Sequence, residues 1–380
     1  MNASKPYILI AVVVLLVGTI YFINSNSVKR AGSDQVVTVI PRVPFKSNSA
    51  ATSPSTEVKK DTMPSKFFSR EVKSKRYELA KEITTPDGFI NTDGKPITIN
   101  SLIGKKVILV DFWTYSCINC QRTTPYLNAW YEKYKDKGFV IIGVHTPEFE
   151  FEKDYNNVKV AVEKFGIKFP VVLDNDYSTW TAYKNQYWPR KYLIDIDGYV
   201  IYDHIGEGGY EETERKIQEA LAERMTVLGE SGTINQGVTK ELPQEGGLKS
   251  RETYFGAARN EFLANGIKGR AGAQQFSEPT TIEPNKLYLV GNWNIQDEFA
   301  TSASVNAKVI YRYQAKHVYF VAGADKSITI QLLRDGKSLG SKTINGHELY
   351  TLVDEPDYTE HTLEIIIPAS GLQAFTFTFG

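Results

Sequence analysis

The chain of 380 residues contains two cysteines, Cys117 and Cys120, within the segment DFWTYSCINCQRTTPYL (111–127). Two thiols separated by two residues at the start of a helix lie close enough to close a small disulfide ring. Backbone N–H groups and the helix dipole favour negative charge at the first thiol, which lowers the pKa of a thiol there and leaves a thiolate able to attack a disulfide. The second thiol then resolves the mixed disulfide. The pair predicts thiol–disulfide exchange.

Other uses of two cysteines stay open. A structural zinc site needs four ligands, generally two cysteine pairs or cysteines with paired histidines. The chain has no further cysteine, and no two of its histidines have the H-x₃₋₅-H spacing; they stand at positions 145, 204, 317, 347 and 361. A permanently closed structural disulfide and two inert core thiols are further alternatives. We predict the reactive pair, no metal site, and no cofactor other than a redox-active disulfide between Cys117 and Cys120.

The elements around the cysteines follow an α/β pattern. The preceding segment, KKVILVDFW (105–113), is a near-continuous apolar run, which is typical of a strand buried on both faces. Helical spacing follows up to Gly138, and strands and helices then alternate before a hairpin with its turn at Asp197 and Gly198. Residues 67–225 are therefore predicted to form one α/β domain. The strand brings the cysteines to the carboxyl edge of the sheet, where sites of α/β proteins generally lie.

A second domain is expected after a linker. Residues 226–249 are rich in glycine and scattered charges and are interpreted as that linker. In 250–380 the helical spacing disappears, and short alternating segments are divided by Gly, Asp-Gly, Asn-Gly and Pro, which predicts an all-β, jelly-roll-like sandwich. Its aromatic residues could stack on sugars or fill the core, and alternation along strands favours the core; they are Tyr288, Trp293, Tyr311, Tyr313 and Tyr319.

The N-terminal part predicts a membrane anchor. Residues 7–23 are an uncharged and mostly apolar run, and about 17 such residues are the lower limit for a helix that crosses a bilayer. We interpret the run as an uncleaved signal-anchor, with 1–6 cytoplasmic, 24–66 a disordered linker and the following domains outside the cytoplasm. A cleaved signal peptide and a buried helix are the alternatives. The formal net charge is zero, so composition gives no reason to expect nucleic acid as a partner.

The cysteine segment also resembles a known family. VDFWTYSCINCQR (110–122) is similar to the active-site segment of the thioredoxin superfamily, in particular of the TlpA/ResA-type exported proteins. It is more similar still to the extracytoplasmic C-terminal region of the DipZ-like cytochrome c biogenesis proteins. That resemblance covers about 85–225 and continues from RETYFGAARNEF (251–262) to the terminal AFTFTFG (374–380). It implies a thioredoxin-like domain followed by a β-rich, carbohydrate-binding-module-like domain.

The resemblance implies catalytic roles for four residues. Cys117 matches the exposed nucleophile of the family and Cys120 the resolving cysteine. Asp111 matches the buried acid beneath the disulfide, which exchanges a proton with Cys120 and needs a pKa raised by burial. An ordinary aspartate at a strand end is the alternative. Pro189 matches the cis proline that exposes the preceding backbone to substrate, whereas an ordinary loop proline is trans.

Substrate contacts are implied for further residues. Trp113 matches the tryptophan beside the disulfide, and Trp188 precedes the proline and is expected to set substrate fit. Ile118 and Asn119 replace the Gly-Pro dipeptide of thioredoxin, so the reduction potential does not carry over. ResA-type proteins have a glutamate where this chain has Thr123.

Two further features near the motif stay secondary. His145 stands at a strand end and either modulates the thiols or is an ordinary hydrogen-bonded histidine. We interpret Glu148, Glu150 and Glu152, which follow it, as solvated side chains.

These observations predict a single-pass cell-membrane thiol-disulfide oxidoreductase with extracytoplasmic domains. By resemblance it reduces protein disulfides, in cytochrome c maturation or in envelope thiol repair. DipZ-like proteins carry a multi-helix electron-conducting membrane domain. We predict at most one membrane crossing in this sequence, so a separate membrane electron donor of the CcdA/DsbD type is expected. Two alternatives are open. One is net oxidation of substrate thiols, and the other is a glycan- or envelope-protein-binding module with the thioredoxin fold as scaffold.

Overall fold

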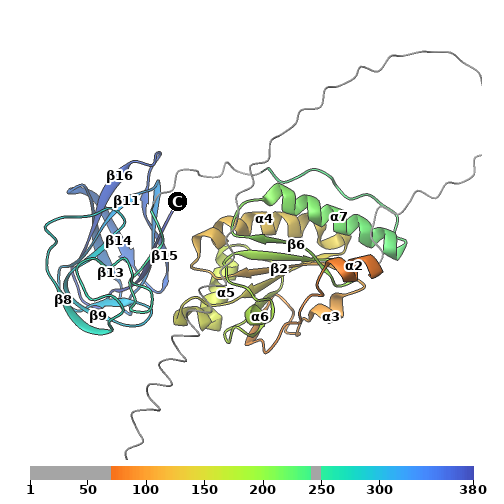
Figure 1. Ribbon diagram of the computed structural model, residues 1–380, viewed down its shortest axis with the longest axis horizontal. Coiled ribbons are helices and arrows are strands. Elements are labelled where there is room, and N and C mark those ends of the chain that lie inside the picture. The colour runs from red at the N-terminus through yellow and green to blue at the C-terminus, as the bar shows by residue number, and fades with distance from the viewer. Residues whose placement is uncertain (1–69, 241–249) are drawn as a thin grey trace, which may run out of the picture. The chain divides into compact units, whose positions relative to one another are not determined.

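A computed structural model describes residues 70–240 and 250–380, which belong to one compact unit of the chain. They form an α/β domain (70–240) and a β domain (250–380), drawn in orange to green and in teal to blue in Figure 1. The predicted anchor at 7–23 lies outside the described residues, as do the cytoplasmic segment and the first linker. Within the described ranges, no helix has the length and apolar character needed to cross a membrane.

The α/β domain is built on a mixed six-stranded sheet with the order β1-β4-β3-β2-β5-β6. Its central strand β2 runs parallel to β3 and antiparallel to β5. All seven residues of β2 are buried, so the prediction of a strand covered on both faces is confirmed. The strands are β1 (Gly88–Ile90), β2 (Val107–Trp113), β3 (Phe139–His145), β4 (Val171–Leu173), β5 (Arg190–Ile194) and β6 (Val200–Ile205).

Helices cover both faces of this sheet (Figure 1). On one face Trp130 of α4 and Leu221 of α7 share a core with Leu109 of β2, and on the other Ile99 of α3 packs with Phe112 of β2. This layering confirms the predicted thioredoxin-like α/β domain. The helices are α2 (Arg70–Arg76), α3 (Ile99–Leu102), α4 (Ile118–Tyr134), α5 (Tyr155–Lys164), α6 (Ser178–Ala182) and α7 (Tyr210–Leu228), with 3₁₀ turns η1 (Lys135–Lys137) and η2 (Glu150–Lys153).

The predicted boundary at residue 225 is wrong. Helix α7 continues to Leu228 and ends at Gly229, whose φ of 66° is the left-handed conformation that glycine favours. The chain then returns to the domain. Ile234 is buried in its core, and the backbone N–H of Thr239 donates to Glu214 on α7. Residues up to 240 therefore belong to the α/β domain, and only 241–249 of the predicted linker lie outside the described residues.

Helix α2 is held on the domain by a buried ion cluster. The Nζ of Lys73 lies 2.7 Å from Asp195, 2.9 Å from Asp197 and 2.6 Å from Glu223. The three carboxylates are close enough together to hold a metal ion. The Lys73 ammonium already supplies the positive charge among them, so the cluster is explained as an ion-pair network between α2, the β5–β6 hairpin and α7.

The β domain, residues 250–380, contains no helix and eleven antiparallel strands that form one hydrogen-bonded sheet. The main path runs β14-β13-β16-β11-β9-β10-β17-β12-β15, with β7 on β17 and β8 on β9. The strands are β7 (Thr253–Tyr254), β8 (Gly272–Phe276), β9 (Leu287–Ile295), β10 (Ala300–Ser302), β11 (Ala307–Gln314), β12 (His317–Gly323), β13 (Ile328–Arg334), β14 (Lys337–Ile344), β15 (Glu348–Asp354), β16 (Glu360–Ile367) and β17 (Gln373–Phe379).

The expected sandwich of two separate sheets is corrected to this single continuous sheet. Strand β9 joins the two halves, because Leu287–Val290 pair with β11 and Gly291–Ile295 pair with β8. Gly291 has a φ of 89° at the junction, a backbone conformation that few other residues adopt. The sheet encloses one large apolar core.

The aromatic residues of the β domain mostly fill that core. Tyr288, Trp293, Tyr311 and Tyr313 are all at most 5% exposed, and only Tyr319 is partly exposed. A sugar-stacking platform built from these five residues is therefore not present, and the alternative reading as core is confirmed for four of them.

Candidate active site

The two cysteines stand at the first turn of α4, as the sequence predicts. Cys117 is the N-cap residue, and its Sγ accepts a hydrogen bond from the backbone N–H of Cys120 at 3.4 Å. Both are free thiols in this structure; Cys117 is partly exposed and Cys120 is buried. Burial, together with the neighbouring Cys117, raises the pKa of the Cys120 thiol well above its usual range. The pair therefore has one accessible and one buried sulfur.

The segment before β5 meets the first cysteine. The peptide bond between Trp188 and Pro189 is cis, so that prediction is confirmed. The Sγ of Cys117 lies 3.9 Å from the carbonyl oxygen of Trp188, which is 71 residues away in the sequence. The indole N–H of Trp188 donates to the carbonyl of Thr146 at 3.0 Å, which fixes the ring beside the motif. The backbone before the proline is thus presented to whatever reaches Cys117.

Beneath the motif lies a buried pair of opposite charges. Asp111 of β2 stands opposite Lys191 of β5 in the antiparallel register, and both side chains are almost fully buried. Burial raises the pKa of Asp111 to about 7, although the Lys191 charge acts in the opposite direction. Burial also lowers the pKa of Lys191, and both charges act on Cys120. The predicted burial of Asp111 is confirmed, and its exchange of a proton with Cys120 stays a prediction. Lys191 was not predicted, because nothing in KYLID distinguishes a buried lysine.

Replacing Asp111 by asparagine tests this pair. The folded pKa of about 7 exceeds the ordinary value of 3.8, so the folded state holds a proton that the unfolded chain releases between these values. The contribution of Asp111 to the free energy of unfolding is therefore highest below about pH 4, and it is lost as the pH rises to about 7. Asp111→Asn is expected to be more stable than the parent at pH 8, by about 4 kcal/mol, and not at pH 4. Urea unfolding at both pH values measures the difference; equal gains at both would contradict the assignment.

The prediction that Glu148, Glu150 and Glu152 are all solvated is wrong for Glu152. Its carboxylate is fully buried and accepts four hydrogen bonds. Ser116 donates its Oγ–H at 2.6 Å and its N–H at 3.2 Å, and the N–H groups of Glu148 and Phe149 donate at 2.6 and 3.0 Å. Burial raises the pKa of Glu152 nonetheless. This carboxylate therefore joins the loop before η2 to the residue that directly precedes Cys117. Glu150, by contrast, is exposed as predicted.

His145 and Trp113 form a buried layer below the motif. His145 is fully buried, with Nε2 lying 3.4 Å from the Oγ1 of Thr114, and burial lowers its pKa to about 3. The ring is therefore neutral at physiological pH and fits the ordinary hydrogen-bonded histidine. The Trp113 indole packs edge-on to this ring at 5.1 Å and is also buried. Trp113 thus belongs to the core rather than to a substrate surface.

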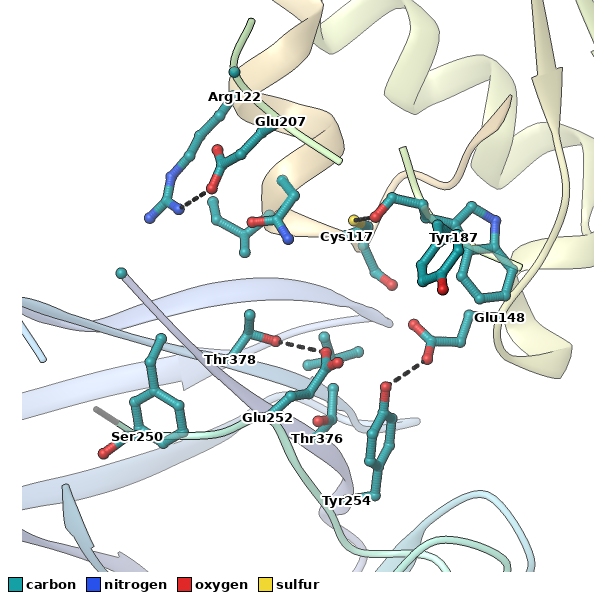
Figure 2. Close-up of a pocket in the computed structure, with 18 of the residues that line it drawn as sticks. Cys117, Arg122, Glu148, Tyr187, Glu207, Ser250, Glu252, Tyr254, Thr376 and Thr378 are labelled. Carbon is teal, nitrogen blue, oxygen red and sulfur yellow. Dashed lines mark hydrogen bonds and ion pairs between the residues drawn. The ribbon is translucent and has the colours of Figure 1, made fainter. Parts of the chain in front are cut away.

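A cleft of about 840 Å³ opens at Cys117, and residues of both domains line it (Figure 2). The predicted substrate residues Ile118, Asn119 and Trp188 line it with the nucleophile, whereas Trp113 does not. Further lining residues, which sequence reasoning did not assign to the site, include Ser116, Arg122, Glu148, Tyr187, Glu207, Ser250, Glu252, Tyr254, Arg259, Thr376, Thr378 and Phe379. The sequence carries no local signal for them, because most lie more than a hundred positions from the cysteines.

The β domain contacts the loop that Glu152 holds. Glu148 accepts from the Tyr254 hydroxyl at 2.8 Å and pairs with Arg259 at 2.7 Å. Phe149 and Phe151 pack against Phe375 of β17, with ring centroids 5.1 and 4.8 Å apart. Contacts with the β domain therefore continue through this loop and Glu152 to the cysteine motif.

Comparison with known proteins gives the same division of the chain. Residues 61–221 match a family model described as Redoxin, and residues 250–380 match one described as thioredoxin like C-terminal domain. Protein DipZ of Mycobacterium bovis is 39% identical over 303 residues, which are 78% of this chain and 43% of DipZ. The chain thus spans less than half the length of that relative.

Smaller relatives match the α/β domain over most of their own length. The thiol-disulfide oxidoreductase ResA of Bacillus cereus is 38% identical over 132 residues, which are 34% of this chain and 73% of ResA. The thiol-disulfide oxidoreductase YkuV of Bacillus subtilis is 30% identical over 142 residues, which are 37% of this chain and 93% of YkuV.

Proposed function

Because this chain belongs to the thioredoxin-like thiol-disulfide oxidoreductases, we propose that it reduces protein disulfides with Cys117 and Cys120. One observation carries the proposal. The Cys117 sulfur faces an open cleft beside the Trp188 carbonyl, while the Cys120 sulfur is buried over Asp111. An accessible nucleophile and a protected resolving thiol next to a proton acceptor are what two-step disulfide reduction requires.

In the first step the Cys117 thiolate attacks one sulfur of the substrate disulfide. A Cys117–substrate S–S bond forms and the substrate S–S bond breaks, so the leaving sulfur departs as a thiolate and takes up a proton. The substrate segment pairs with the backbone at Trp188, beside which the Cys117 sulfur lies.

In the second step Cys120 resolves the mixed disulfide. Asp111 takes the proton of the Cys120 thiol as this thiol attacks the Cys117 sulfur. The Cys117–Cys120 bond forms, the bond to substrate breaks, and the substrate leaves with both of its sulfurs reduced. A pKa of about 7 suits Asp111 to accept and return this proton near neutral pH.

Asp111→Asn should therefore slow the second step as well as stabilise the fold. We expect the release of reduced substrate to slow by about 10- to 100-fold at pH 8, with loss of the rise in rate near pH 7. Rapid-quench measurement of the mixed disulfide separates the two steps. A rate of attack that falls as much as the rate of release would instead indicate a general structural defect.

The cycle needs electrons from a dithiol donor, since each turnover leaves the pair oxidised. We place the described domains outside the cytoplasm, tethered by residues 7–23, with a membrane protein of the CcdA/DsbD type as the donor. The similarity to DipZ over most of this chain supports that setting and a role in cytochrome c maturation or thiol repair.

The reduction potential of the pair tests the direction. Residues 67–380, equilibrated with dithiol buffers, are expected to give a value near −270 mV, at the reducing end of the thioredoxin range. A potential near about −120 mV would make the protein a disulfide donor and reverse the proposed direction. If the pair does not equilibrate at all, a binding role with the thioredoxin fold as scaffold becomes the better explanation.

A further inference from the structure

The cleft at Cys117 has two walls, and the β domain forms one of them (Figure 2). Its volume of about 840 Å³ lies within the ~300–1,000 Å³ range of pockets that enclose ligands of drug size. A folded domain cannot enter a space of this size, whereas an extended stretch of a few residues fits. The substrate disulfide must therefore arrive on such a stretch, between Trp188 on one wall and the β domain on the other.

The charges that line the cleft are unequal. Three glutamates and two arginines lie on its walls. Arg122 pairs with Glu207 at 3.3 Å, and Arg259 pairs with Glu148 at 2.7 Å. Among the residues that the structure describes, no cation forms an ion pair with the third glutamate, Glu252. Among the charged side chains that line the cleft, one carboxylate is thus in excess.

Glu252 is placed to meet a ligand. Its side chain is exposed to the cleft, and its Oε1 accepts a hydrogen bond from the Oγ1 of Thr378 at 3.2 Å. Glu148, Tyr254, Arg259 and Thr378 surround it. Desolvation of the carboxylate by the surrounding protein, and next the charge of Glu148, raise the pKa of Glu252 to about 7. The carboxylates of Glu148 and Glu252 repel each other, and a second positive charge beside Glu252 would offset this repulsion.

The aromatic side chains near Glu252 also suit a cation. Arg259 already lies over the Tyr254 ring, 3.7 Å from its centroid, so this part of the wall holds one guanidinium by ring contact and ion pairing. Tyr187 and Phe379 add further aromatic surface to the lining. Carboxylates and aromatic faces are the groups with which proteins bind lysine and arginine side chains.

We propose that Glu252 is a specificity-determining residue, which pairs with a lysine or arginine beside the substrate cysteine when an extended polypeptide enters the cleft. This inference rests on the proposed disulfide reduction and adds to it the class of substrate. The β domain is then the part of the protein that selects disulfides by the charge of their neighbours.

Three synthetic peptides test the inference. Each carries one disulfide in the same short sequence, with lysine, glutamine or glutamate next to the cysteines. The pre-reduced protein is mixed with each oxidised peptide, and the second-order rate constant of a single turnover is measured. At pH 8 we expect the lysine peptide to react about 10-fold faster than the glutamine peptide, as one charge-assisted contact allows. Protonation of Glu252 should reduce this ratio below about pH 7.

Substitutions at Glu252 sharpen the result. Glu252→Gln should bring the lysine-to-glutamine ratio close to one, and Glu252→Lys should favour the glutamate peptide. Glu261→Gln is the matched control, because Glu261 is an exposed glutamate of the same domain that does not line the cleft, and it should keep the parental ratio. Because ratios within one variant are compared, a general loss of rate or of folded protein does not imitate the effect.

The outcomes separate this inference from the proposed function. Equal rates for all three peptides with the parent protein, or an unchanged ratio in Glu252→Gln, would overturn the role of Glu252 and leave disulfide reduction standing. A parent protein that reduces none of the peptides, although its Cys117–Cys120 pair equilibrates with small dithiols, would overturn the polypeptide cleft as well. If the pair itself never equilibrates, both the proposed function and this inference fail.

Discussion

Cys117→Ser is expected to lose disulfide reduction by more than about 10³-fold, the largest effect of any single substitution in this chain. A serine hydroxyl at this N-cap position still accepts the hydrogen bond from the Cys120 N–H, so the fold should persist. Cys120 cannot take over the attack, because its sulfur is buried and its pKa is raised. The measurement is turnover of a peptide disulfide, with far-UV circular dichroism as the check on folding.

Cys120→Ser separates the two roles. Cys117 should still attack, but no second thiol is left to resolve the product, so a covalent protein–substrate disulfide should accumulate. Mass spectrometry of the quenched reaction detects this species. If Cys117→Ser instead accumulated the adduct, or if both variants kept turnover, the assignment of nucleophile and resolving thiol would be wrong.

Glu152→Ala is expected to produce the largest loss of stability. Removal of the carboxylate leaves the N–H groups of Ser116, Glu148 and Phe149 and the Ser116 hydroxyl without their acceptor. Each unsatisfied buried donor costs about 1–3 kcal/mol, so we expect the free energy of unfolding to fall by about 3 kcal/mol or more. Urea unfolding at neutral pH measures this change.

Glu150 provides the matched control for Glu152. It stands two positions earlier, and its side chain is exposed and forms only an ion pair with Lys153, at 2.5 Å. Glu150→Ala should change the free energy of unfolding by less than about 0.5 kcal/mol. Similar losses in the two variants would mean that the buried carboxylate of Glu152 has no special part in holding the loop.

The sequence allowed the centre of the site to be predicted because local patterns encode it. The apolar run of β2 and the helical spacing after Cys117 can each be recognised in a short stretch of sequence. Together they place the cysteines between the strand and the helix. The cis bond before Pro189 and the burial of Asp111 followed from the family resemblance. The strand and the helix depend on residues whose neighbours in sequence are also their neighbours in space, whereas Trp188 meets Cys117 across 71 positions of the chain and needed the family resemblance.

The features that could not be predicted depend on long-range packing. Glu152 looks like a surface glutamate, and only the η2 turn directs its carboxylate back to Ser116. Lys191 is buried because β5 pairs with β2 and places it opposite Asp111. Glu252 reaches the cleft only through the contacts between the two domains. A pattern of charges along the chain contains none of this information.

The β domain shows the same limit at the level of topology. The alternation of apolar and polar residues predicts strands and the face of each strand that is buried, and the structure contains these strands. Alternation does not say which strands are neighbours, and β9 takes part in both halves of the sheet through the bend at Gly291. A strand shared in this way turns an expected pair of sheets into one.

The composition of β14 bears on how the protein behaves at high concentration. Among the described strands β14 pairs only with β13, so one of its sides offers free N–H and C=O groups to another molecule. This strand is mostly exposed and carries two lysines, Lys337 and Lys342. It lies against a bulge at Leu332 and Leu333. Lysines and bulges make a sheet edge a poor template for strand addition. We therefore expect edge-to-edge aggregation through β14 to be suppressed at high protein concentration.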